Sequence, residues 1–291
     1  MSARYFPPSE LIVNADGSIF HLHVQPEQLA DRVILVGDPG RVANVAGHFD
    51  TIECDISNRE FKTITGSYKG KRITVLSTGI GTDNIDIVVN ELDALANIDL
   101  STRMEKPVFR QLTLVRIGTS GGMQPDIPLG SFLISEKSIG FDGMLNFYEG
   151  RDAVSDLPFE EALKQQLEWN PQLAAPYVVD ADAGLVEQIG RDDMIRGVTI
   201  SANGFYGPQG RVLRIGLADP RINDKIEAFR FKHYKITNYE MEGSAIAGLS
   251  KMMGHKAMTV CCVIANRRVE AANTNYQPYI EELIVKVLDR I

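Results

Sequence analysis

The chain has 291 residues, enough for one sizeable hydrophobic core or two smaller ones. Apolar residues make up 44% and charged residues 23%, which is typical of a soluble globular protein. The formal net charge of −8 argues against a general nucleic-acid-binding surface but leaves room for a local basic pocket that binds a small anion. No apolar run approaches the ~18–20 residues that cross a bilayer, and residues 1–9 lack the features of a signal peptide.

The three cysteines predict reduced thiols, because they are too few for a disulfide framework and two of them, Cys261 and Cys262, are sequence neighbours of each other. Reduced thiols are typical of a cytoplasmic protein, which is the location we expect. The chain contains no Cys-x-x-Cys, no His-x-x-x-His and no acidic calcium loop, so no metal site is expected.

Short apolar runs alternate with helical patterns along the chain, which predicts an α/β fold. In chain order, we predict strands at 32–36, 60–68, 72–77, 112–117, 131–135, 197–202, 235–239 and 257–264, and helices from 41 and at 83–97, 159–169, 221–231, 242–253 and 279–291. No linker rich in Pro, Gly and Ser interrupts the pattern, so a single domain over 1–291 is expected. The polar stretch 97–111, which carries Pro107, is interpreted as an insertion between a helix and a strand.

Three predicted strands end in glycine-bearing turns, at 37–41, 77–81 and 116–122. In open α/β sheets, ligands bind at the carboxyl ends of strands, and glycine lets backbone N–H groups approach an anion. Arg41 and Arg116 at these turns predict a phosphate-sized oxyanion site, since guanidinium groups bind phosphate through paired hydrogen bonds. Taken alone, glycine after a strand is more often ordinary turn chemistry, and neither standard nucleotide-binding fingerprint is present.

Two further segments combine groups that suit ligand binding. Residues 238–242 place Glu240 and Glu242 where a strand passes into a helix. Two such carboxylates near a pocket suit the binding of sugar hydroxyls or acid and base chemistry. The alternative, which spacing alone favours, is that Glu242 only stabilises the first helical turn through the helix macrodipole. Residues 205–211 join aromatic rings to an amide and a guanidinium, a set suited to a planar base with two carbonyl oxygens, although this segment by itself is more often an ordinary loop.

Seven segments in this order resemble the signature segments of the uridine phosphorylases, within the nucleoside phosphorylase superfamily. They are 37–41, 58–61, 77–81, 116–121, 205–211, 238–242 and 266–267. The resemblance runs from about Phe20 to the C-terminus, which makes 1–19 an N-terminal extension. It implies a single-domain, three-layer fold in which helices flank a mixed central sheet that forms a partly closed barrel.

The resemblance also implies a role for each matching residue. The residues implied to bind phosphate are Gly37, Arg41, Arg116, Thr119 and, from a neighbouring subunit, Arg59. Those implied at the ribose are Met241, Glu242 and His21, the last reaching the neighbour's site. Those implied at the base are Ser120, Gly121, Phe205, Gln209, Arg211 and Arg267. The residues implied to carry the catalytic chemistry are Arg116, Glu242, Arg211 and Gln209.

The implied enzyme is a pentosyltransferase of pyrimidine salvage and nucleoside catabolism, which splits uridine with phosphate into uracil and ribose 1-phosphate. It needs no metal or organic cofactor, has no nucleic-acid or membrane partner, and forms a dimer or a hexamer of dimers whose active sites are shared between subunits. A structural monovalent cation between subunits, near Glu60 and Ile80, is also implied.

Three alternatives remain open at this point. A nucleoside hydrolase on the same fold is disfavoured because it has little use for three converging arginines. A purine nucleoside phosphorylase is disfavoured by Gln209 and Arg211, and because purine-specific relatives use an aspartate in the segment 266–267. A non-catalytic nucleoside-binding protein could dispense with the phosphate site.

The chain departs from the family pattern at three places. In 206–211 it reads Tyr-Gly-Pro-Gln-Gly-Arg where many members have Tyr-Pro-Gly-Gln-Glu-Arg. This exchange affects the path of the loop and the direction in which the Gln209 side chain points. Gly243 stands where serine is usual, and the stretch 97–111 is longer than in compact bacterial members.

Overall fold

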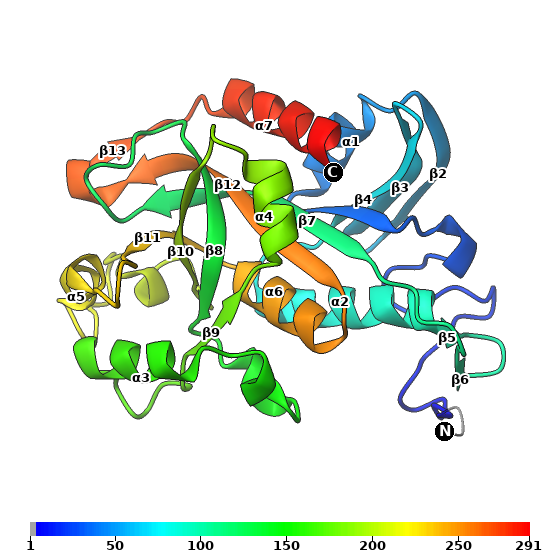
Figure 1. The fold of residues 1–291 in the computed structure, drawn as a ribbon, viewed down its shortest axis with the longest axis horizontal. Coiled ribbons are helices and arrows are strands. Elements are labelled where there is room, and N and C mark those ends of the chain that lie inside the picture. Colours follow the sequence, from blue (N-terminus) through cyan, green and yellow to red (C-terminus); the bar gives the residue numbers. More distant parts are fainter. Residues whose placement is uncertain (1–3) are drawn as a thin grey trace.

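A computed structural model describes residues 4–291 and shows a large central sheet with helices on both sides (Figure 1). The strands of the main sheet follow the order β13-β12-β8-β10-β11-β7-β1-β4-β3-β2, with β9 beside β8. Strand β12 pairs in parallel with β7 and antiparallel with β8, so β12, β8, β10, β11 and β7 close into a ring. The predicted α/β fold with a mixed, partly closed barrel is therefore confirmed.

The bounds of the elements are as follows. The strands are β1 Arg32–Val36, β2 Thr51–Asn58, β3 Phe61–Tyr68, β4 Lys71–Ser77, β5 Ile98–Asp99, β6 Met104–Glu105, β7 Thr113–Gly122, β8 Phe132–Gly140, β9 Tyr177–Asp180, β10 Ile195–Ser201, β11 Ile236–Glu240, β12 Lys256–Asn266 and β13 Ala271–Ala272. The helices are α1 Pro39–Ala46, α2 Thr82–Asn97, α3 Leu157–Gln166, α4 Ala183–Gly190, α5 Ile222–Ala228, α6 Gly243–Met252 and α7 Gln277–Arg290. Short 3₁₀ turns include η4 Gly207–Gln209 and η5 Arg267–Val269.

Most predicted elements are present, and the differences have physical reasons. The prediction that 118–122 is a turn is wrong: these residues continue β7, pairing with β12 from Gly118↔Cys261 to Gly122↔Asn266 and with β11 through Gly121 and Gly122. Glycine in a strand permits a close backbone approach, and here it lies where the barrel closes.

Other errors concern boundaries and exposed strands. Helix α1 begins at Pro39, two residues before the predicted start, because Asp38 caps it by accepting from the Gly40 N–H at 2.8 Å. Strand β2 was not predicted, since none of its residues is fully buried and it therefore has no buried apolar run. Strand β9 and helix α4 were also missed.

The stretch interpreted as an insertion contains a small hairpin, in which β5 pairs with β6 at Ile98↔Glu105. The N-terminal segment lies against it, because Tyr5 forms a bridge with Met104. The first three residues of the predicted 1–19 extension lie outside the described part of the chain. That 97–111 is an insertion and that 1–291 is one domain remain predictions.

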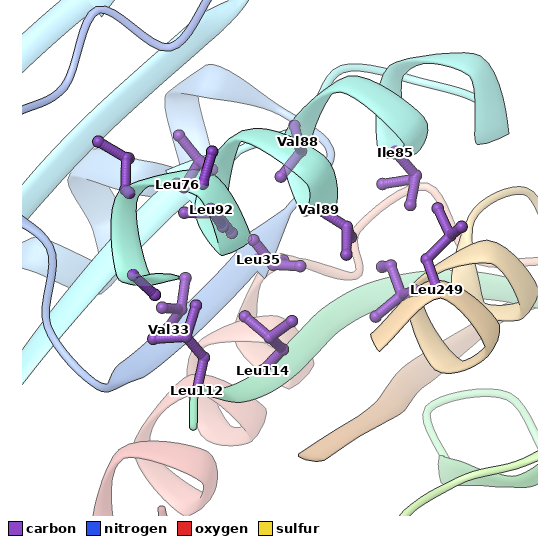
Figure 2. Packing of buried hydrophobic residues seen from close by; sticks show 14 of the residues in the cluster. Val33, Leu35, Leu76, Ile85, Val88, Val89, Leu92, Leu112, Leu114 and Leu249 are labelled. Atoms are coloured by element: carbon purple, nitrogen blue, oxygen red, sulfur yellow. The ribbon is translucent and has the colours of Figure 1, made fainter. Parts of the chain in front are cut away.

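The core has apolar clusters on both faces of the sheet. Figure 2 shows Ile85, Val88, Val89 and Leu92 of α2 packed against strand residues such as Leu35, all of them buried. On the other face of β1, Ile34 and Val36 join a cluster that includes residues of α1, α4 and α7. Successive residues of a strand point to opposite faces, so β1 contributes to both clusters and the fold has three layers. No helix within residues 4–291 has the length and apolar character to cross a membrane.

Candidate functional site

A cavity of about 570 Å³ opens where the ends of several strands meet. The segments after β1, β4, β10 and β11 reach it, together with the last part of β7 and of β12. The predicted site residues that line it are Gly37, Arg41, Arg116, Thr119, Ser120, Gly121, Phe205, Gln209, Arg211, Met241 and Glu242. Segments separated by up to about two hundred residues thus converge on one cavity, whereas Arg59, His21 and Arg267 do not line it.

In the cavity wall, the buried guanidinium of Arg116 is held by two carboxylates. Its Nη2 donates to Glu242 Oε2, and its Nη1 lies 3.3 Å from Glu240 Oε2. Nη1 also donates to Cys261 Sγ at 3.4 Å. Burial by itself lowers the pKa of Arg116, but the two carboxylates outweigh burial and raise it. The guanidinium is therefore a fixed positive charge in the wall.

Gly118 makes this placement possible. Residues two apart in a strand point to the same face, so the Arg116 side chain folds back over Gly118. A Cβ added to Gly118 would lie 2.0 Å from Arg116 Nη1 and 2.8 Å from its Cζ. Only glycine leaves room for the guanidinium in this position.

The two carboxylates that end β11 and precede α6 have different partners. Glu240 accepts from the Gly243 N–H at 2.9 Å and the Glu242 N–H at 2.8 Å, and Ser201 Oγ donates to it. Glu240 therefore satisfies the N-terminus of α6. Glu242 makes no side-chain hydrogen bond to that helix end. The side chain that hydrogen-bonds to the first turn is thus that of Glu240, whereas the Glu242 side chain points toward Arg116 and Gly81.

Glu242 faces the cavity from a buried position. Its Oε1 accepts from the Gly81 N–H at 2.8 Å, and Gly81 has a φ of +101°, which glycine adopts readily. Burial raises the pKa of Glu242 further than the charge of Arg116 lowers it. The carboxylate is thus oriented by one backbone donor and one guanidinium.

A second guanidinium lies close to Arg116. Arg41 donates from Nη1 to the Ile117 carbonyl at 3.3 Å, and burial together with the charge of Arg116 lowers the pKa of Arg41. Thr119 and Gly37 line the same cavity. Two neighbouring positive charges, a hydroxyl and a glycine turn form a site suited to a small oxyanion such as phosphate.

Another part of the wall carries aromatic and amide groups. The Arg211 guanidinium stacks on the Phe205 ring, 3.7 Å from its centroid, and donates to Gln209 Oε1 at 2.6 Å. Burial and the nearby Arg267 lower the pKa of Arg211 to about 10. Despite the exchanged proline and glycine, the turn η4 keeps Gln209 in the cavity wall with only 4% of its surface exposed.

Arg267, Arg59 and His21 lie elsewhere. Arg267 is directly behind the wall, where its Nη1 donates to the Gln209 carbonyl. Arg59 is exposed at the turn between β2 and β3, 5.7 Å from the centroid of the Phe20 ring. His21 lies 2.6 Å from Glu91 on α2. Asn58 donates to the His21 carbonyl at 2.7 Å, so His21 and Arg59 lie near one another, and neither lines this chain's cavity.

Sequence reasoning did not include several lining residues, of which Glu240 is the most important. The two carboxylates of 238–242 were noticed, but their separate roles depend on the strand–helix junction that turns Glu240 back onto α6. Ile264 also lines the cavity and belongs to no predicted motif, and Tyr239, which lies within 238–242, was given no role. Within residues 4–291, no three His, Cys, Asp or Glu side chains are grouped to hold a metal ion.

Comparisons with known proteins agree on one family. A family model described as the phosphorylase superfamily matches residues 31–288. The chain is 30% identical over 280 residues to the uridine phosphorylase of Haemophilus influenzae, covering 93% of this chain and 95% of the relative. It is 29% identical over 270 residues to the uridine phosphorylase of Thermococcus kodakarensis, and the match covers 90% of this chain and 82% of the relative. A solved structure of a Trypanosoma brucei nucleoside phosphorylase, described as showing uridine phosphorylase activity, is 28% identical in sequence and has a TM-score of 0.86. The match covers 97% of this chain and 100% of that protein.

The contact between Arg116 and Gly118 predicts the effect of Gly118→Ala. The added methyl displaces the guanidinium, so inorganic phosphate should bind at least tenfold more weakly, roughly the contribution of one charge-assisted hydrogen bond. Titration calorimetry with phosphate measures this. Gly216→Ala is the control, because a Cβ there meets no atom within 4 Å. Unchanged phosphate affinity in a folded Gly118→Ala protein would contradict the assignment of the anion site.

Proposed function

The chain belongs to the phosphorylase superfamily, and from this we propose that it is a uridine phosphorylase, which uses inorganic phosphate to split uridine into uracil and ribose 1-phosphate. One observation carries the proposal. A single cavity presents the guanidinium groups of Arg41 and Arg116, the amide–guanidinium pair of Gln209 and Arg211, and the buried carboxylate of Glu242.

The base must leave as a stabilised anion. As the N-glycosidic bond stretches, negative charge builds on the uracil ring, and Arg211 and Gln209 present donors to its carbonyl oxygens and the ring edge. Such preorganised donors lower the barrier most when they meet charge that develops in the transition state. Phe205, stacked under Arg211, supplies the aromatic surface beside the base.

Phosphate must bind on the face of the ribose that is opposite the base. Arg41, Arg116 and Thr119 hold it there, so that its negative charge faces the cation-like anomeric carbon before it attacks. Holding two reactants in place contributes a large part of the rate by itself. No side chain of the protein forms a covalent bond to the substrate in this scheme.

In this scheme the ribose lies between the base and the phosphate, beside Met241 and Glu242. The Glu242 carboxylate accepts hydrogen bonds from sugar hydroxyls, and these bonds strengthen as the sugar becomes positive. Because Gly81 and Arg116 already orient the carboxylate, it needs little rearrangement during the reaction.

The alternatives fit the cavity less well. A hydrolase has no use for two guanidinium groups and a hydroxyl aimed at an anion. A purine phosphorylase would need a carboxylate in the segment 266–267. Asn266 stands there, and its Nδ2 donates to the carbonyls of Gln124 at 2.8 Å and Ile127 at 3.0 Å, outside the cavity. A protein that only binds nucleosides would not need an anion site.

The proposed reaction takes phosphate as co-substrate and no metal or organic cofactor, because arginine side chains supply the positive charge that it requires. The thiols of Cys54, Cys261 and Cys262 are free, which supports the proposed cytoplasmic location.

The proposal is tested by uracil release from uridine with and without phosphate. We expect cleavage only with phosphate, ribose 1-phosphate as the second product, and slow cleavage of inosine because Gln209 and Arg211 suit uracil's carbonyls. Product chromatography checks all three. Equal rates in phosphate-free buffer would identify a hydrolase, inosine cleaved as fast as uridine would identify a purine enzyme, and uridine binding without cleavage would identify a binding protein.

The proposed active site also requires a second subunit. Arg59 and His21 lie near one another and do not line the cavity of their own chain, which supports the proposal that each completes the site of a partner in a dimer or a hexamer of dimers. A two-fold contact is self-complementary, so each subunit of a pair would donate one Arg59 and receive one.

Mixing two inactive variants tests this sharing. Arg59→Ala and Arg41→Ala should each be nearly inactive. Arg41 is preferred to Arg116 here because removing Arg116 would leave Glu240 and Glu242 buried without their partner. After random subunit exchange, half the pairs are mixed and each holds one intact site, so roughly a quarter of all sites should recover. If mass measurement confirms exchange and no activity returns, Arg59 acts within its own chain.

The predicted monovalent cation is a further part of this proposal. Glu60 and Ile80 are both exposed, and the Glu60 side chain lies against Gly79. In this proposal the ion is shared by two subunits and stabilises their contact. The thermal midpoint should therefore be higher in potassium than in tetramethylammonium chloride at equal ionic strength. Equal midpoints would contradict the cation site.

A further inference from the structure

The turn that carries Gln209 is held from outside the cavity by residues with no assigned function. We propose that Asn223 and Arg268 are positioning residues that set the selectivity for the base, because they fix the backbone from which Gln209 reaches into the cavity. This inference rests on the proposed function, since it names what makes the same site selective for uracil.

The Gln209 side chain is oriented by its neighbours. Its Oε1 accepts from Arg211 at 2.6 Å, and within residues 4–291 its Nε2 has no protein acceptor, although the residue lines the cavity. Apart from this one contact with Arg211, the position of the Gln209 side chain depends on its main chain, which lies in the short turn η4. A 3₁₀ turn of three residues has little rigidity of its own.

The main chain of Gln209 is held by two side chains behind the wall. Asn223 of α5 donates from Nδ2 toward the carbonyls of Gln209 at 3.3 Å and Gly210 at 3.4 Å. Arg267 Nη1 donates to the same Gln209 carbonyl. The carbonyl therefore receives donors from two elements that are far apart in the sequence.

Gly210 and Asn223 also fit each other in shape. Gly210 has a φ of +67°, and a Cβ added to it would lie 2.4 Å from Asn223 Nδ2. The Asn223 amide therefore occupies the space that any side chain at position 210 would need, so this contact requires glycine there.

Arg268 secures α5 in turn. Its Nη1 lies 3.0 Å from Asp224 and its Nη2 lies 2.5 Å from Glu227, both on α5. Arg267 and Arg268 are consecutive residues of η5, one directed to Gln209 and the other to α5. The turn η4, helix α5 and turn η5 are thus tied into one unit, which we call the η4 clamp.

This arrangement separates base recognition from phosphate binding. Asn223, Arg267 and Arg268 do not line the cavity, and Arg41 and Arg116 have no contact with the η4 clamp among the hydrogen bonds and ion pairs of residues 4–291. A loosened clamp should therefore weaken recognition of uracil and leave phosphate binding unchanged. A general loss of folding would weaken both.

The experiment compares Asn223→Ala and Arg268→Ala with matched controls. Asn146→Ala also removes an amide that joins two segments, at 2.9 Å from the Ala175 carbonyl, and Arg196→Ala removes an ion pair of similar exposure, 30% against 33% for Arg268. For Asn223→Ala we expect kcat/KM for uridine to fall about fivefold to tenfold, the scale of one hydrogen bond, mainly through KM. The rate with inosine and the KM for phosphate should not change.

Arg268→Ala should act in the same direction with a smaller effect, and both controls should match the wild type. Calorimetry with uracil gives a second readout that does not depend on turnover. If both variants are folded and keep the wild-type ratio of uridine to inosine cleavage and the wild-type uracil affinity, the inference is overturned while the proposed function stands. A wild-type protein that neither cleaves uridine nor binds uracil overturns the proposed function and this inference with it.

Discussion

A buried guanidinium is tolerated only when its charge is matched, and the cavity is organised around that requirement. Arg116 lies in a strand that is covered on both faces, and Glu240 and Glu242 supply two carboxylates within reach of it. Removing a charge from water without such partners would cost several kcal/mol. These ion pairs join Arg116 of β7 to the junction of β11 and α6. The same two strands pair where the barrel closes, so the ion pairs and the closure of the barrel support each other.

Support for this cluster extends well beyond the cavity. Ser201, at the end of β10, donates to Glu240 and accepts from the Ser244 N–H at 2.8 Å. The Ser244 hydroxyl lies 2.9 Å from Tyr177 Oη, and Tyr177 donates to Asp142 at 3.0 Å. This buried chain of polar groups joins β9, β10 and α6. Because every member is partnered, this network of polar groups makes the part of the cavity wall around Glu240 and Arg116 rigid.

The part of the wall that carries Gln209 and Arg211 is built differently. Gln209 and Arg211 lie in a segment after β10 that belongs to no long element, and side chains rather than sheet hydrogen bonds hold it. Loops carried on a rigid scaffold commonly provide specificity, since they change without disturbing the core. Here the Asn223 amide lies against Gly210 and donates to the Gln209 carbonyl at 3.3 Å, so a side chain of α5 supports the loop.

The sequence by itself determined the α/β class, the strand at 32–36 and the helix over 83–97, because apolar periodicity carries that information. Most of the residues that line the cavity were predicted through the resemblance of seven segments to the uridine phosphorylases. Tertiary structure alone decided that 118–122 continue β7, since glycine-rich residues become a strand only when β11 and β12 lie beside them. It also decided that Glu240 rather than Glu242 satisfies the start of α6, because two carboxylates two residues apart differ only in what the fold brings near them. Hydrogen bonds between distant segments, such as that from Asn223 to Gln209, leave no local pattern in the chain from which they could be predicted.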